Sequence, residues 1–106
     1  MLTELESNLM NRFKQGSTII LESKVDYVEF GIFGSFARGD IKCGSDVDFV
    51  IIVNDLSNRR LISTLRDNLE EIGCDLAVLL KDNFDNPKTI FAKKVKTDYR
   101  RVHYVE

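Results

Sequence analysis

Several residue types are scarce in this 106-residue chain, which has one proline, two cysteines and one histidine. The two cysteines, Cys43 and Cys74, are too few for a disulfide scaffold. Together with His103 they also cannot supply the four ligands of a structural zinc site. No apolar stretch approaches the ~20 residues that span a bilayer, and the N-terminus lacks a basic segment followed by an apolar one. We therefore expect a cytoplasmic chain with no membrane partner.

An excess of positive charge is also missing. Fifteen Lys and Arg residues face seventeen Asp and Glu residues, for a formal net charge of −2 and a sequence pI near 5.4. A protein that binds nucleic acid over its whole surface usually has a pI above about 9, so nucleic acid is not an expected direct ligand. Hydrophobic residues make up 43% of the chain and charged residues 30%, a globular composition. We predict that residues 1–106 form a single domain.

Hydrophobic periodicity predicts that helices and strands alternate along the chain. Thr3 and Glu6 have the spacing of a capping box, and Gly16 is expected to end the helix that they open. Residues 17–24 fit either a short helix or a strand. The remaining elements are strands over 27–33, 47–53, 75–80 and 99–105, a helix over 57–72, a polar loop over 82–86, and a helix over 88–95 that follows the cap Asn86 and Pro87. The predicted fold class is α/β (α+β), a small mixed β-sheet with helices packed on it.

Paired carboxylates mark the most informative segment. Asp46 and Asp48 stand two apart at the head of the apolar run 47–53, so on a strand both side chains point to the same face. Two neighbouring carboxylates do not both ionise easily unless a cation lies between them, and oxygen ligands of this kind suit Mg²⁺. Asp75 opens the next predicted strand and reaches the same cluster if the two strands are neighbours. Three such acids could hold two metal ions, the arrangement used for phosphoryl or nucleotidyl transfer.

A glycine-serine turn precedes these acids. Gly34 and Ser35 follow the strand over 27–33, and a helix or helical turn is expected to begin at Phe36. Backbone N–H groups at such a turn can hold an anionic phosphate, aided by the Ser35 hydroxyl. Arg38 is a candidate clamp on phosphate oxygens because its guanidinium is planar and bidentate. Each feature alone is more often structural, but the turn and the acids together predict a phosphate and metal site.

The turn and the acids also resemble a known signature. Gly34-Ser35 is followed, after ten residues, by Asp46-x-Asp48, which is similar to the pattern of the DNA-polymerase-β-like nucleotidyltransferase superfamily. The fuller string GSFARGD…SDVDFVI, with the later CDLAVL, resembles the minimal nucleotidyltransferase (MNT) branch of that superfamily. The resemblance covers roughly residues 25–80, and the tail 90–104 also looks like the ending of that branch.

The resemblance implies a polymerase-β-like core and an enzyme that uses ATP as substrate with two Mg²⁺ ions. The implied site residues are the metal-binding and catalytic acids Asp46, Asp48 and Asp75, and the nucleotide-binding residues Gly34, Ser35 and Arg38. MNT proteins similar to this chain pair with a small helical HEPN ribonuclease as a toxin–antitoxin system. In such a pair the MNT protein is the antitoxin and moves AMP from ATP onto a tyrosine of the toxin.

Two other functions stay open at the level of sequence. The motif and the sheet use most of the chain, so we expect another molecule to complete the acceptor site. The first alternative is a non-catalytic antitoxin that neutralises its partner by binding, and the second is a nucleotidyltransferase with a small-molecule or RNA acceptor. The C-terminal region is locally basic, which we interpret as a solvated helix face. The alternatives are a surface that faces phosphate or RNA, or a patch that binds an acidic partner. Its basic residues are Lys88, Lys93, Lys94, Lys96, Arg100 and Arg101.

Overall fold

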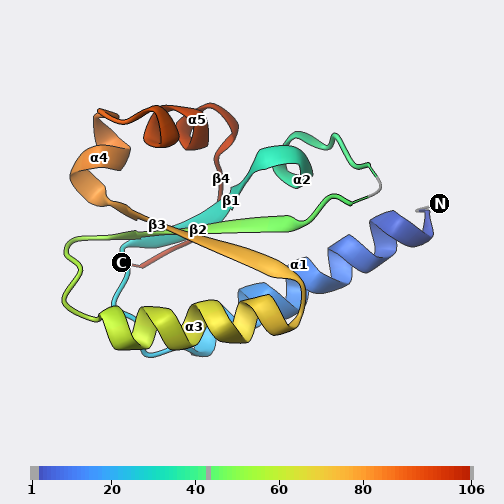
Figure 1. The fold of residues 1–106 in the computed structure, drawn as a ribbon, viewed down its shortest axis with the longest axis horizontal. Coiled ribbons are helices and arrows are strands. Elements are labelled where there is room, and N and C mark those ends of the chain that lie inside the picture. Colours follow the sequence, from blue (N-terminus) through green and yellow to red (C-terminus); the bar gives the residue numbers. More distant parts are fainter. Residues whose placement is uncertain (1–2, 43, 106) are drawn as a thin grey trace.

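The computed structural model describes residues 3–42 and 44–105, which form five helices and four strands (Figure 1). In chain order the elements are α1 (Glu4–Glu22), β1 (Glu29–Phe33), α2 (Gly34–Arg38), β2 (Val47–Val53), α3 (Arg59–Glu71), β3 (Cys74–Leu80), α4 (Lys81–Asp85), α5 (Ile90–Asp98) and β4 (Arg100–Tyr104). The strands form one sheet in the order β3-β2-β1-β4. β2 is parallel to β3, whereas β1 is antiparallel to both β2 and β4. Over the described ranges, no helix is long and apolar enough to cross a membrane.

β2 lies at the centre of the sheet because its side chains are buried on both faces. Every residue of β2 is buried except Asp48, which is partly buried. Strand side chains alternate between faces, so Phe49 and Ile51 join one cluster with residues of α1 and α3. Val50 and Ile52 join a second cluster with residues of α4 and α5. Figure 1 shows α1 and α3 on one side of the sheet and α4 and α5 on the other.

The short helix α2 lies at the end of the sheet and contacts a helix of each layer. The ring of Phe36 lies 5.6 Å from that of Phe13 in α1. Arg38 Nη1 lies 2.7 Å from the Asp98 Oδ2 oxygen at the end of α5. α2 therefore links the two helical layers at the point where β1 ends and where the chain returns to form β2.

The sequence predicted that Gly16 ends the first helix, and this prediction is wrong. α1 continues through Gly16 to Glu22, so most of the ambiguous segment 17–24 is helical. Gly16 is buried, and a Cβ at this position would stand 2.8 Å from Cζ of Phe49. A glycine is therefore needed here because α1 packs closely against the sheet. This contact joins residues distant in sequence, so the local sequence does not reveal it.

The segment between β3 and α5 also differs from the prediction. Residues 82–86, expected as a polar loop, lie mostly in α4, where Phe84 is buried and Lys81 pairs with Asp85 at 2.7 Å. α5 begins at Ile90 instead of 88, because the Thr89 side chain caps it by accepting the N–H of Ala92. Pro87 therefore precedes α5, and Asn86 closes α4.

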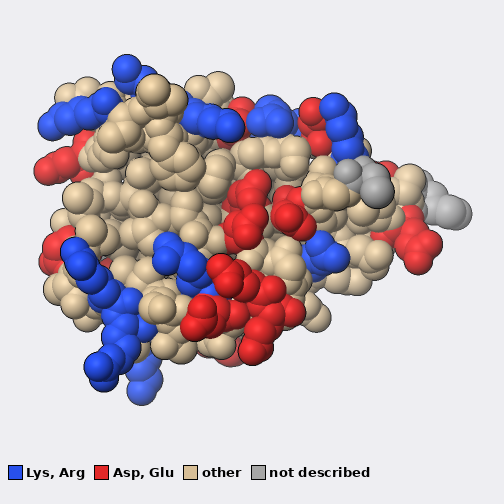
Figure 2. Space-filling model, viewed as in Figure 1, with Lys and Arg blue, Asp and Glu red and all other residues tan. Residues whose placement is uncertain are grey.

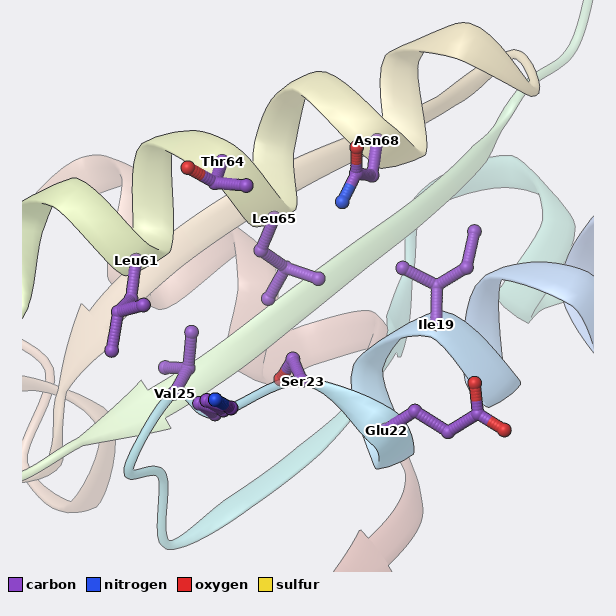
Figure 3. Close-up of a pocket in the computed structure, with 9 residues that line it drawn as sticks. Ile19, Glu22, Ser23, Val25, Leu61, Thr64, Leu65 and Asn68 are labelled. Carbon is purple, nitrogen blue, oxygen red and sulfur yellow. The ribbon is translucent and has the colours of Figure 1, made fainter.

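A hollow of about 390 Å³ opens between the end of α1 and α3 (Figure 3). Its lining includes the apolar side chains of Ile19, Val25, Leu61 and Leu65. Three of these also belong to, or pack against, the core cluster on the α1 and α3 side of the sheet. The hollow thus lies in the layer opposite the one that α4 and α5 form, and none of the acids predicted from the motif lines it.

Candidate active site

Two of the predicted acids meet at the edge of the sheet where β2 and β3 begin. In the parallel pairing of these strands, Asp48 lies opposite Asp75, and the two carboxyl groups are close enough for Asp75 to raise the pKa of Asp48. Asp75 is exposed, whereas Asp48 is partly buried. Figure 2 shows acidic side chains gathered on this face, over the start of the two strands. The crossover through α3 therefore brings together two carboxylates that are distant along the chain.

The environment of Asp48 favours its protonated form. Burial raises the pKa of this carboxyl group from 3.8 to about 6, helped by the hydrogen bond to Asp75 and by the charges of Asp75 and Asp46. A half-buried carboxylate beside a second acid is stabilised by a divalent cation, and an all-oxygen donor set suits Mg²⁺. The acids present at this edge therefore fit the metal that the sequence implies.

The third acid has a different neighbour. Asp46 lies one residue before β2, and its Oδ1 oxygen is 3.6 Å from Nη1 of Arg12 in α1. The side chains of Arg12 and Asp46 are 40% and 52% exposed. Within residues 3–42 and 44–105, no three His, Cys, Asp or Glu side chains lie close enough together to hold a metal ion. The structure thus brings Asp48 and Asp75 together as a pair. Asp46 lies near this pair but faces the guanidinium of Arg12.

The backbone of Gly34 approaches Asp48 closely. Gly34 has φ of +79°, a conformation that disfavours residues with a Cβ. A Cβ at Gly34 would stand 2.7 Å from Oδ2 of Asp48. Phe33 precedes α2 and supplies no side-chain hydrogen bond to cap it, and α2 begins at Gly34, two residues earlier than expected. The first backbone N–H groups of α2, including that of Ser35, therefore lie close to the pair of acids.

Arg38, the predicted phosphate clamp, forms an ion pair with Asp98 at the end of α5. Its Nη1 atom donates a hydrogen bond to Oδ2 of Asp98 at 2.7 Å. The Asp98 side chain is only 11% exposed, so the ion pair ties the end of α2 firmly to the end of α5. The guanidinium predicted to clamp phosphate is thus already paired with a carboxylate of the chain.

The motif did not reveal two basic residues near the acids. Arg12 pairs with Asp46, and Lys94 of α5 lies close enough to Asp48 to lower the pKa of that carboxyl group. Both lie far from the motif along the chain, and only the basic C-terminal composition hinted at Lys94. Cys74, next to Asp75, is a buried free thiol, as expected, and burial raises its pKa to about 11. Cys43 lies outside the described residues.

A turn that presents backbone N–H groups beside acids on adjacent strands can place a triphosphate next to divalent cations, as the chemistry of nucleotidyltransferases requires. The sequence model of the nucleotidyltransferase domain matches residues 18–103. That range includes most of the chain. The chain therefore belongs to the nucleotidyltransferase domain family and is an enzyme of this class, which confirms the predicted family and enzyme type.

Individual relatives are similar in sequence or in fold. A Methanocaldococcus jannaschii protein named "Putative protein adenylyltransferase" is 32% identical over 91 residues, 86% of this chain and 84% of that protein. The crystal structure of a "putative nucleotidyltransferase" from Sulfolobus solfataricus matches with a TM-score of 0.61 and 22% identity, covering 95% of this chain and 85% of that one. A chain in the complex of the tri-AMPylated Shewanella oneidensis HEPN toxin with MNT antitoxin matches with a TM-score of 0.57 and 14% identity, covering 92% and 73%. These solved structures share the fold, which confirms the predicted fold class.

Proposed function

We propose that this chain transfers AMP from ATP to a hydroxyl group of a partner protein and acts as the antitoxin of a small helical HEPN-type toxin. The observation that carries the proposal is the Asp48–Asp75 pair beside the bare backbone of Gly34, where a triphosphate and a divalent cation can meet. The name of the M. jannaschii relative and the fold shared with the HEPN–MNT complex support a protein as the acceptor. We expect the acceptor group to be a tyrosine hydroxyl.

Different residues of the site bind the triphosphate and remove the proton from the attacking hydroxyl group. The backbone N–H groups at Gly34 and Ser35 hold the triphosphate. The acceptor oxygen forms a bond to the α-phosphorus, the bond from that phosphorus to its bridging oxygen breaks, and pyrophosphate leaves. Asp75 takes the hydroxyl proton as general base, a role that its exposed position at the edge of the sheet allows.

Asp46, Asp48 and Asp75 are the residues that would hold Mg²⁺. When bound, Mg²⁺ neutralises phosphate charge and lowers the pKa of the attacking hydroxyl. Asp48 gains most from a nearby cation, because burial and Asp75 oppose its ionisation. Asp46 has to break its ion pair with Arg12 in order to bind the cation together with Asp48 and Asp75.

Intact-mass measurement of the partner tests the proposal. The protein encoded beside this one, as the candidate partner, is co-expressed with the wild-type chain, with Asp46→Asn, or with Asp26→Asn. Asp26→Asn is a matched control at an exposed carboxylate between α1 and β1. We expect the partner to gain the mass of one or more AMP groups with wild type and with Asp26→Asn only. A gain of the same size with Asp46→Asn would contradict the assignment of the site.

The same measurement separates the two alternatives. A tight complex in which the partner keeps its unmodified mass would overturn transfer and favour an antitoxin that acts by binding. Labelling of RNA or of a small molecule by the purified chain, with the partner absent, would favour a nucleotidyltransferase with a different acceptor.

A further inference from the structure

One flank of α5 faces α2 and touches both of its ends. Phe91, Lys94 and Asp98 are spaced by three and four residues, so they lie along one side of the helix. The ring of Phe91 meets that of Phe33 at 5.9 Å, edge to face. Asp98 meets Arg38 at 2.7 Å. Phe33 comes directly before α2 and Arg38 is its last residue, so we call this side the α2-facing flank.

Lys94 is the middle residue of the α2-facing flank. Because its two neighbours on the flank contact Phe33 and Arg38, at the start and the end of α2, Lys94 lies on the side of α5 that faces α2. Lys94 is exposed, and in the described part of the chain no carboxylate lies within ion-pairing distance of its ammonium group. Its positive charge is therefore available to a ligand.

The sheet places the acids on the same face as α5. Asp48, Val50 and Ile52 alternate to one face of β2, and Val50 and Ile52 pack in one cluster with Ala92 and Val95 of α5. Asp48 projects from that face just beyond the part that α5 covers. Figure 2 shows basic side chains over α5 and α2 and acidic side chains over the start of β2 and β3. A ligand in the site thus lies between acids on one side and a basic helix on the other.

We propose that Lys94 binds the terminal phosphates of the nucleotide, which leave as pyrophosphate. The inference rests on the proposed function and assigns a residue of α5 to the nucleotide site. Arg38 was the candidate for this role, but its charge is already neutralised by the nearly buried Asp98. Within residues 3–42 and 44–105, no carboxylate pairs with Lys94, and a lysine ammonium is a compact phosphate ligand.

Titration calorimetry with three probes tests this assignment. ATP, AMP and inorganic tripolyphosphate are each titrated, with Mg²⁺, into wild type, Lys94→Gln, Lys94→Arg and Lys93→Gln. Lys93 is the matched control, since it is exposed and adjacent but points away from the α2-facing flank. We expect Lys94→Gln to bind ATP and tripolyphosphate about tenfold more weakly. Its affinity for AMP should be unchanged, Lys94→Arg should keep most of the affinity, and Lys93→Gln should match wild type.

Each contrary result has its own meaning. Equal losses in Lys93→Gln and Lys94→Gln would show a general charge effect and overturn the inference. A loss for AMP as large as that for ATP would overturn a role at the terminal phosphates. Unchanged ATP binding in Lys94→Gln would overturn the inference and leave the proposed function standing. A wild-type chain that binds neither ATP nor tripolyphosphate would overturn the proposed function together with this inference.

Discussion

At the scale of single residues, Asp48 shows how a position in the sheet sets the chemistry of a carboxyl group. The other residues of its strand are all buried, and Asp75 stands opposite it. Burial and this neighbour raise the pKa of Asp48 from 3.8 to about 6. The native state therefore keeps a proton that the unfolded chain has already lost. The stability contributed by this group is fully present below the unfolded pKa and is lost as the pH rises through the folded value.

This linkage predicts a pH-dependent difference between wild type and Asp48→Asn when EDTA removes divalent cations. The free energy of unfolding of wild type, relative to the variant, should fall by about 1 kcal/mol as the pH rises from about 4 to about 7. The effect is modest because Asp48 is only half buried and solvent screens its charge. Urea unfolding at a series of pH values measures it. Asp26→Asn should instead follow wild type, and a constant difference between wild type and Asp48→Asn would contradict the linkage.

The residues of the site differ in how far the sequence could predict them. Gly34, Ser35, Asp46, Asp48 and Asp75 stand out because a turn, a fixed spacing and an apolar strand are local patterns. Arg12 and Lys94 come from the two helices at opposite ends of the chain, and only folding brings them near these acids. No spacing rule joins them to the motif.

At the scale of the elements, the sequence correctly predicted the helix and strand boundaries that depend on contacts between residues close together along the chain. Thr3 and Glu6 form the expected capping box, in which Thr3 Oγ1 accepts the N–H of Glu6 at 3.1 Å. The apolar run over 47–53, predicted as a strand, forms β2 with the same bounds. The errors at Gly16 and at α4 both arise from buried contacts, with Phe49 in one case and around Phe84 in the other.

The packing of α1 predicts an unusual response to Gly16→Ala. Inside an exposed helix this change stabilises by about 1 kcal/mol, because alanine has the higher helix propensity. Here the new Cβ would overlap the ring of Phe49, so we expect a net destabilisation of about 1–2 kcal/mol. Urea unfolding compares the variant with Gln15→Ala, an exposed neighbour that should stay within about 0.5 kcal/mol of wild type. Stabilisation by Gly16→Ala would show that the ring moves aside at little cost.

At the scale of the whole molecule, the site depends on the order of the strands. The parallel neighbours β2 and β3 bring Asp48 and Asp75 together, and β4 closes the far side of β1. The sequence predicted four strands in a mixed sheet, but it could not predict which strands are neighbours, because pairing is decided by long-range packing. The contribution of α5 to the site follows from the same arrangement, since α5 packs on the face from which Asp48 projects.

Because the acids sit on two strands joined by a crossover, a cation bound between them should stabilise the whole fold. A ligand that binds only the native state stabilises it by about 2.7 kcal/mol at one hundred times its Kd. For a domain of this size, each kcal/mol raises Tm by about 4–8 °C. We therefore expect MgCl₂ at one hundred times its Kd to raise the Tm of EDTA-treated wild type at neutral pH by about 10–20 °C, and excess EDTA to reverse the gain.

Two comparisons distinguish a bound cation from screening by salt. NaCl at matched ionic strength should give much less stabilisation, because screening of surface charges is shared by all salts. Asp26→Asn should gain as much as wild type, whereas Asp48→Asn should gain little, because it has lost the carboxylate that benefits most from the cation. An equal gain in Asp48→Asn and wild type would place the cation elsewhere on the molecule. In that case the acid pair at the start of β2 and β3 would need a role other than holding a metal ion.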